Sequence, residues 1–160
     1  MEPNQPTTKK KSKPALSLRA RALGLLAQRE YSKLELARRL LQYTEDPDEI
    51  PPLIEDFVER GWLSETRVAE QVVATRRKRF GSQRITQELR QKGLSEEAIA
   101  GARAVLKEGE LEAAREVWRR KFPEPPATAA DKARQMRFLQ GRGFSLDTIR
   151  KVIAGADDDE

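Results

Sequence analysis

Residues 89–99 read LRQKGLSEEAI, and residues 139–149 read LQGRGFSLDTI, so one pattern occurs twice at a spacing of fifty residues. In both copies a leucine is followed by a glycine, an apolar residue, a serine and an isoleucine at matching positions. Glycine favours the end of a helix because it adopts the left-handed conformation, and serine favours the start of the next helix because its hydroxyl caps the first turn. The pattern therefore predicts two helices joined by a tight turn, present in two copies of one structural unit.

The same signals extend along the chain on both sides of these turns. Apolar residues recur at the i, i+3, i+4 and i+7 spacing of one helix face, and no stretch alternates apolar and polar residues as a strand does. Ser32 with Glu35 forms a capping box, and Gly61 marks the end of a helix that starts near Pro51. We therefore predict an all-α fold. Its expected apolar faces include Leu18, Ala22, Leu25 and Leu26; Leu36, Ala37, Leu40 and Leu41; Ile50, Leu53, Ile54, Phe57 and Val58; Val68, Ala69, Val72 and Val73; Ile85 and Leu89; Ala98, Ile99, Ala102, Val105 and Leu106; Leu111, Ala114, Val117 and Trp118; Met136 and Leu139; and Leu146, Ile149, Val152 and Ile153, with Ser64, Ser82, Ser95 and Ser145 as further N-caps.

The helices group into three tandem three-helix repeats at residues 15–63, 64–107 and 108–154. A disordered basic tail at 1–14 precedes them, and an acidic tail at 155–160 follows them. One repeat of this size buries too little apolar surface to be comfortably stable alone, so neighbouring repeats are expected to pack in series. The predicted architecture is an elongated, curved array, and we expect it to be a monomer.

The residue types exclude several functions. The chain has 160 residues, 36% of them charged, and contains neither histidine nor cysteine, so the usual zinc ligands, the commonest general acid or base and all thiol chemistry are missing. It has no glycine-rich phosphate loop either. We therefore expect no enzymatic activity, no metal and no cofactor. No segment is apolar enough to span a membrane and no signal peptide is visible, so a cytoplasmic location is expected.

Positive charge is concentrated in the second half of the chain, whose overall net charge is +5. Residues 64–107 carry ten basic and five acidic side chains and residues 108–154 carry ten and seven, whereas residues 15–63 carry seven and nine. This distribution suits a polyanion or an acidic protein surface as partner. The alternative is a solvated surface without any such partner.

Two runs of basic residues end predicted helices, at 76–79 and at 119–121. Cations at a helix C-terminus stabilise the macrodipole by roughly 0.3–1 kcal/mol each, which is the structural interpretation. The functional interpretation is contact with an acidic protein surface or with DNA phosphates. The candidate contact residues are Arg76, Arg77, Lys78, Arg79, Arg84, Arg90, Arg119, Arg120 and Lys121.

The aromatic residues favour packing over base stacking. Trp62 follows a glycine that ends a helix, and Trp118 lies on an apolar face, so both are expected in the core. Tyr31 and Tyr43 flank the second helix and are also expected to pack. Stacking on nucleic-acid bases would need aromatic side chains spread through a basic groove, and the sequence lacks that pattern.

The sequence resembles the RecX family of bacterial regulatory proteins over about residues 16–154. The resemblance rests on three groups of residues that occur in the family's order and spacing. They are Arg21–Leu23, Leu25, Leu26, Arg29, Ser32, Glu35, Leu36 and Leu40; Gly61–Ala69, Arg76, Gly81, Ile85, Glu88, Leu89 and Lys92–Leu94; and Phe138, Leu139, Arg142–Phe144 and Ile149.

This resemblance implies tandem helical repeats that bind the RecA recombinase, lie along the groove of its nucleoprotein filament and restrain its recombinase, ATPase and coprotease activities. Such a role belongs to DNA repair, recombination and the SOS response, and the family has no catalytic residue or cofactor. The alternative is direct, sequence-independent binding that masks single- or double-stranded DNA. A sequence-specific reader is not expected, because only Gln83, Arg84, Gln87 and Arg90 approach the side-chain set that reads bases in a major groove.

Overall fold

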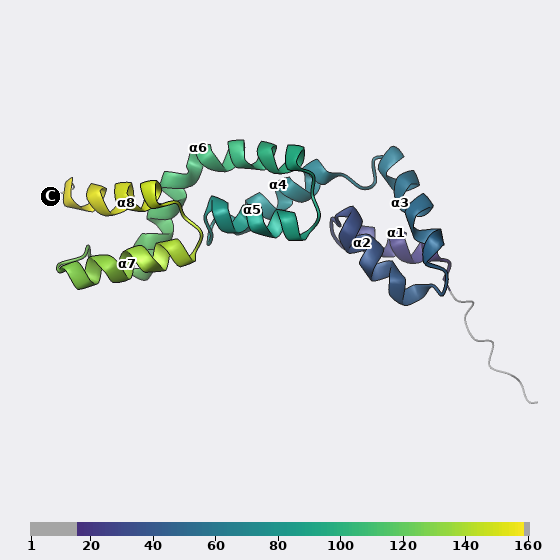
Figure 1. Cartoon of the computed structure of the whole chain (residues 1–160), viewed down its shortest axis with the longest axis horizontal. Coiled ribbons are helices and arrows are strands. Elements are labelled where there is room, and N and C mark those ends of the chain that lie inside the picture. The colour runs from purple at the N-terminus through teal and green to yellow at the C-terminus, as the bar shows by residue number, and fades with distance from the viewer. Residues whose placement is uncertain (1–15, 159–160) are drawn as a thin grey trace, which may run out of the picture.

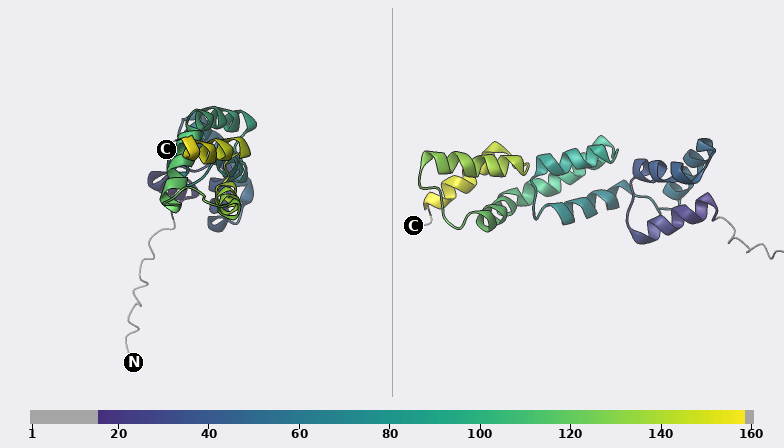
Figure 2. Two further views of the ribbon diagram at one scale, coloured as in Figure 1. Left: turned by 90° about the vertical axis from the view of Figure 1, so that its left-hand side faces the viewer. Right: turned by 90° about the horizontal axis from the view of Figure 1, so that it is seen from below.

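The computed structural model describes residues 16–158, with side chains placed as far as residue 155. Within this range it contains eight α-helices, two short 3-10 helices and no strand, which confirms the predicted all-helical fold. The predicted basic tail at 1–14 lies outside the described residues. The helices form three groups that follow one another along one direction, so the molecule is elongated (Figure 1) and has a narrow profile when it is viewed along its length (Figure 2).

The first unit consists of α1 (Leu18–Gln28), α2 (Lys33–Leu40) and α3 (Ile50–Glu59). The predicted capping box is present, because the Glu35 amide donates to the Ser32 hydroxyl while the Ser32 amide donates to the Glu35 carboxylate, both at 3.1 Å. Two 3-10 helices, Leu41–Tyr43 and Pro47–Glu49, connect α2 to α3. Gly61 follows α3 with a φ of 76°, as predicted for a glycine that ends a helix.

The second unit consists of α4 (Glu65–Arg76), α5 (Ser82–Gln91) and the first part of α6 (Glu96–Lys121). Ser64 and Ser95 cap α4 and α6 as predicted. The prediction for Ser82 is wrong, because α5 begins at Ser82 with Gly81 at the N-cap and no capping side chain. The Ser82 hydroxyl instead donates to the Glu110 carboxylate on α6 at 2.9 Å, a tertiary contact that replaces the local one.

The third unit consists of the second part of α6 with α7 (Ala129–Gly141) and α8 (Leu146–Asp158). We predicted separate helices on either side of residue 107, but α6 is one helix of 26 residues. An internal glycine costs a helix about 1 kcal/mol and does not by itself end it, and α6 contains two, Gly101 and Gly109. In addition, α8 extends past residue 154, where the acidic tail was expected to begin.

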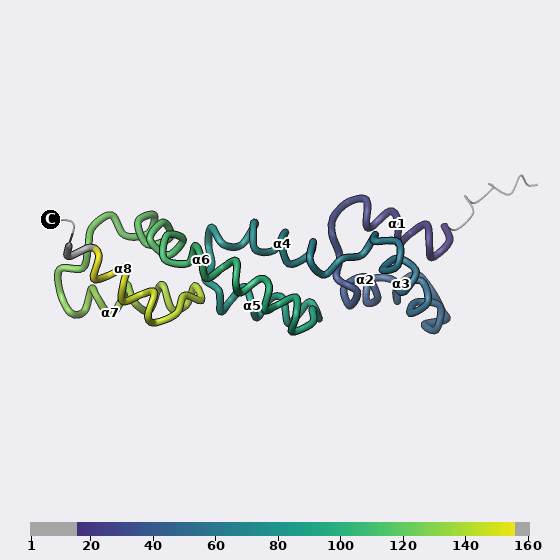
Figure 3. Tube along the Cα trace, turned by 90° about the horizontal axis from the view of Figure 1, so that it is seen from above, coloured from purple at the N-terminus to yellow at the C-terminus, as the bar shows by residue number. Residues whose placement is uncertain are grey.

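Each unit has an apolar core of its own, and α6 contributes to two of these cores. Ile99, Ala102 and Leu106 belong to the core of the second unit, and Ala114 and Val117 to that of the third. The first unit shares no helix with the second, and the trace passes between them through a single connection from α3 to α4 (Figure 3). The second and third units are therefore joined more firmly than the first and second.

Several residues predicted to be buried lie at the edges of these small cores. Val105 is 51% exposed and Leu146 45%, and Leu41, Tyr43 and Val58 are exposed as well. Three helices enclose only part of each apolar face, so the outermost positions of a face meet solvent. The two tryptophans differ in solvent exposure because each small core encloses only part of an apolar face. The prediction that Trp62 lies in the core is wrong, because Trp62 is 39% exposed, with its ring centroid 5.4 Å from that of Phe57. Trp118 packs against the third core as predicted and donates to Gln135 at 2.7 Å.

Candidate functional site

The turn between α4 and α5 touches the turn between α7 and α8 backbone to backbone. The Gly81 amide donates to the Arg142 carbonyl at 2.8 Å, and the Gln83 amide donates to the Gly143 carbonyl at 3.1 Å. A Cβ atom on Gly81 would lie 2.5 Å from the carbonyl carbon and oxygen of Gly143, so no side chain fits there. The close contact fixes the third unit on the second and brings the basic residues near both turns together.

Cationic side chains lie close to two aromatic rings at this contact. The guanidinium of Arg84 lies 4.0 Å from the ring centroid of Phe80, and that of Arg142 lies 5.5 Å from the same centroid. Arg142 and the Lys121 ammonium also lie 5.1 and 5.7 Å from the ring centroid of Phe138. Cation–π attraction of this kind is worth about 0.5–1 kcal/mol at an exposed site, enough to favour a position for these side chains at the surface.

The two predicted basic runs meet at this junction. Arg120 on α6 donates to the carbonyl of Lys78, 42 positions earlier, at 3.5 Å. A shallow hollow of about 320 Å³ lies between the two segments, and Arg77, Lys78 and Arg120 line it together with Gly109 and the two carboxylates of Glu112 and Glu116. We call the following set the basic junction: Arg77, Lys78, Arg79, Arg84, Arg120, Lys121 and Arg142.

Three of the predicted contact residues are engaged elsewhere. Arg76 pairs with Glu88 at 3.1 Å, because it lies on the side of α4 that faces α5. Arg90 pairs with Glu96 at 3.5 Å, and Arg119 pairs with Glu116 on its own helix at 3.7 Å. Exposed pairs of this kind contribute about 0–1 kcal/mol, so these arginines remain accessible but are partly neutralised.

Arg142 is the residue of the basic junction that the sequence argument missed. Its position just before Gly143, in the repeated turn, was a usable signal, because Lys92 holds the same place before Gly93. Both cations lie at a contact between units. Lys92 pairs with Glu35 of the first unit at 3.1 Å, while Arg142 lies against Phe80 of the second.

Side chains rather than backbone groups hold the first unit on the second. Besides the pair between Lys92 and Glu35, Arg67 on α4 pairs with Glu30 at 3.0 Å. Burial alone would raise the pKa of Glu35, but hydrogen bonds from the Ser32 amide and Lys92 outweigh it and leave that pKa below its ordinary value. The charged form of Glu35 therefore stabilises the contact between the first and second units.

Replacing Lys92 with methionine should weaken the contact between the first two units by about 1 kcal/mol, since a half-buried cation is lost. The pKa of Glu35 should then rise toward its ordinary value of 4.5, as a carbon-13 NMR titration would report. Because the folded-state pKa is depressed, the contribution of Glu35 is complete above the unfolded-state pKa and disappears as the pH falls through the folded one. An unchanged titration in the variant would contradict this account.

Two other kinds of site are absent from the described part of the chain. No three potential metal-binding side chains gather among its placed residues. None of its helices is long and apolar enough to cross a membrane. The arginines of the basic junction carry a fixed positive charge, since arginine stays protonated in proteins.

Comparison with known proteins matches the sequence of this chain to one family. Family models described as the second and third three-helix domains of RecX match residues 64–102 and 108–153. A protein of Leptothrix cholodnii named regulatory protein RecX is 49% identical over 146 residues, covering 91% of this chain and 93% of its own. One of the same name from Herbaspirillum seropedicae is 47% identical, covering 90% and 94%.

A solved structure agrees in fold. The crystal structure of RecX from Lactobacillus salivarius superposes with a TM-score of 0.76 over 88% of this chain and 94% of that one, at 18% identity. At this identity the likeness concerns the fold alone. The assignment rests on the sequence relatives, because the match covers nearly the full length of each of them. The chain belongs to the RecX family of regulatory proteins.

Proposed function

We propose that this protein binds the RecA recombinase and its nucleoprotein filament through the basic junction, and that it thereby inhibits the recombinase, ATPase and coprotease activities in DNA repair and the SOS response. It acts as a cytoplasmic monomer and has no catalytic activity of its own. The observation that carries the proposal is the meeting of two basic segments, 42 positions apart, where the second and third units contact each other backbone to backbone.

The shape of the molecule supports a filament as the partner. The three units follow one another in a row, so contacts can be spread along an extended object instead of being concentrated in one cleft (Figure 1). The basic junction places positive charge near the middle of that row, where it can meet acidic side chains of a filament. Complementary charge of this kind raises the rate of association and fixes the orientation of the complex.

The test is the ATP hydrolysis of RecA on single-stranded DNA with less than one copy of this protein per recombinase. Strong suppression at such ratios, together with weak binding to the bare strand, is the expected result. Suppression only when the protein saturates the strand would instead show that it acts by masking DNA.

DNA masking is the second candidate, and one observation favours it. The second helices of the three units, α2, α5 and α7, lie in a row along one edge of the molecule (Figure 1). Their acidic residues Glu35, Glu88 and Asp131 are all engaged in ion pairs. Exposed cations therefore dominate this edge, and each DNA phosphate that they neutralise would add about 0.9 to the slope of log affinity against log salt. The exposed cations of this edge that lie outside these ion pairs include Arg38, Arg39, Arg84, Lys132 and Arg137.

A further inference from the structure

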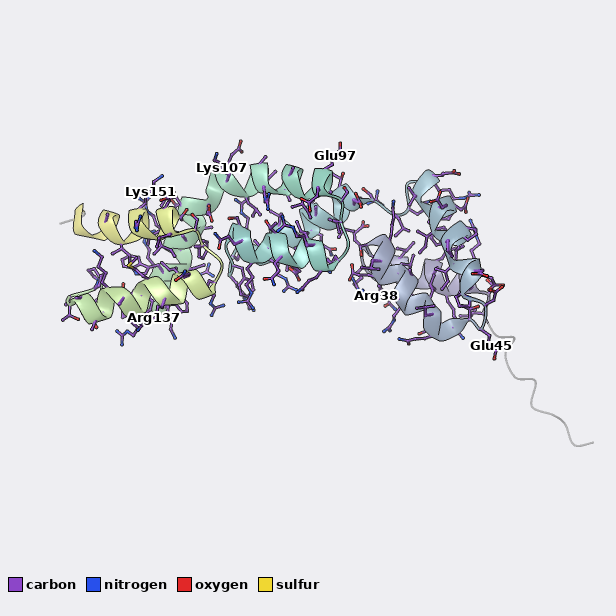
Figure 4. The ribbon with its side chains drawn as sticks, in the orientation of Figure 1. Arg38, Glu45, Glu97, Lys107, Arg137 and Lys151 are labelled. Atoms are coloured by element: carbon purple, nitrogen blue, oxygen red, sulfur yellow. The ribbon has the colours of Figure 1, made fainter. Side chains whose placement is uncertain are left out.

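A groove of about 820 Å³ lies between α4 and α6 on the second unit. Both helices also pack on α5, yet no residue of α5 lines the groove, so it opens on a different side of the unit. Glu97, which lines the groove, projects from α6 on the side away from α5 (Figure 4). The groove is thus separate from the edge formed by α2, α5 and α7.

Small apolar side chains make the floor of this groove. Ala69, Val73 and Ala102 are buried there, while Ala74 and Gly101 leave the space between the helices open. A Cβ atom added to Gly101 would meet no atom within 4 Å. A width and depth made by small residues on two neighbouring helices suit a third helix that inserts larger apolar side chains.

The rim of the groove is acidic, whereas the unit that contains the groove is basic overall. Glu70 and Glu97 are exposed at the rim, and neither forms an ion pair with the described residues. Glu65 lies beside them and accepts hydrogen bonds from Ser95 at 2.7 and 3.2 Å. Arg77 is the one cation among the lining residues. An acidic rim repels phosphates, so the groove does not suit DNA even though the unit as a whole is strongly basic.

We propose that this groove binds an amphipathic helix of the protein partner, one that carries lysine or arginine beside its apolar face. This inference rests on the proposed function and adds a second, chemically different contact to it. The basic junction meets acidic groups of the filament, while the groove takes a basic, apolar helix. Arg77 lines both the groove and the hollow of the basic junction, so the two contacts are adjacent.

Gly101→Leu tests the groove directly, because a Cβ atom at this position meets no atom within 4 Å and the rest of the leucine side chain would occupy space in the groove. It should also leave the fold intact, since leucine is a better helix former than glycine. Gly24→Leu is the matched control, as Gly24 lies in α1 with equally free space around it. We expect Gly101→Leu to weaken binding to the RecA filament on single-stranded DNA by at least about tenfold, and Gly24→Leu to bind as the unaltered protein does.

A charge reversal tests the chemistry of the occupant. The double variant Glu70→Lys/Glu97→Lys should bind the filament more weakly than Glu55→Lys/Glu59→Lys, which changes the net charge equally but on α3. Overlapping peptides that cover the RecA sequence serve as probes for the occupant. A basic amphipathic peptide should bind the unaltered protein in fluorescence anisotropy and should not bind Gly101→Leu.

The possible outcomes separate this proposal from the proposed function. If the unaltered protein binds the filament and Gly101→Leu binds it equally well, the groove proposal is overturned and the proposed function stands. The groove proposal also fails if Gly101→Leu loses affinity for bare DNA to the same extent, or if sedimentation shows a dimer that only this variant loses. If the unaltered protein does not bind the filament, the proposed function fails and the groove proposal falls with it.

Discussion

Replacing Gly143 with alanine should lower the free energy of unfolding by about 3 kcal/mol and loosen the contact between the second and third units. Gly143 has a φ of 92°, a region that costs a residue with a Cβ about 1–2 kcal/mol. The added Cβ would also lie 2.5 Å from the Cβ and 2.7 Å from the amide nitrogen of Arg84. Relief of that clash would break two hydrogen bonds between the turns, each worth about 1 kcal/mol. Urea unfolding followed by circular dichroism measures the loss.

Gly61→Ala is the control that separates backbone strain from the clash. Gly61 has a φ of 76°, close to that of Gly143, but a Cβ atom there would meet nothing within 4 Å. Its replacement should therefore cost only the strain, about 1–2 kcal/mol. Equal losses in the two variants would show that the close contact between the turns contributes nothing to stability.

Removing three cations of the basic junction, in the variant Arg77→Ala/Lys78→Ala/Arg120→Ala, should weaken inhibition of RecA by roughly 100-fold. Each lost contact with an acidic partner group is taken as about 1 kcal/mol, and every 1.4 kcal/mol corresponds to a tenfold change in affinity. The measurement is the concentration that halves ATP hydrolysis on single-stranded DNA. The fold should be retained, since these side chains lie at the surface and away from the three apolar cores.

The matched control removes three exposed cations outside the basic junction, Lys107, Arg150 and Lys151, with the same change in net charge. Lys151 projects from α8 on the side away from α7 (Figure 4), and Lys107 lies on α6 outside the basic junction. We expect this variant to inhibit within about threefold of the unaltered protein, as surface charges that meet no partner contribute little. If both triple variants lose inhibition equally, net charge alone matters, and DNA masking becomes the better account.

The sequence by itself determined the helices and most of their ends, because these depend on neighbours a few positions apart. The capping box at Ser32, the caps at Ser64 and Ser95 and the left-handed glycines at 61, 93 and 143 all occur where the pattern predicted them. Burial also follows the apolar period through most of each face. The local pattern therefore sufficed for the fold class.

Only the tertiary structure decided how the units are joined and which charges meet. The pattern around Gly109 is compatible with one helix or two, and packing of α6 into two cores selects one. Arg76 and Arg77 are neighbours in sequence, yet one pairs with Glu88 and the other faces the hollow near Arg120. The physical reason is that a cap or an apolar period acts within a few residues, whereas a basic junction exists only once distant turns are docked backbone to backbone.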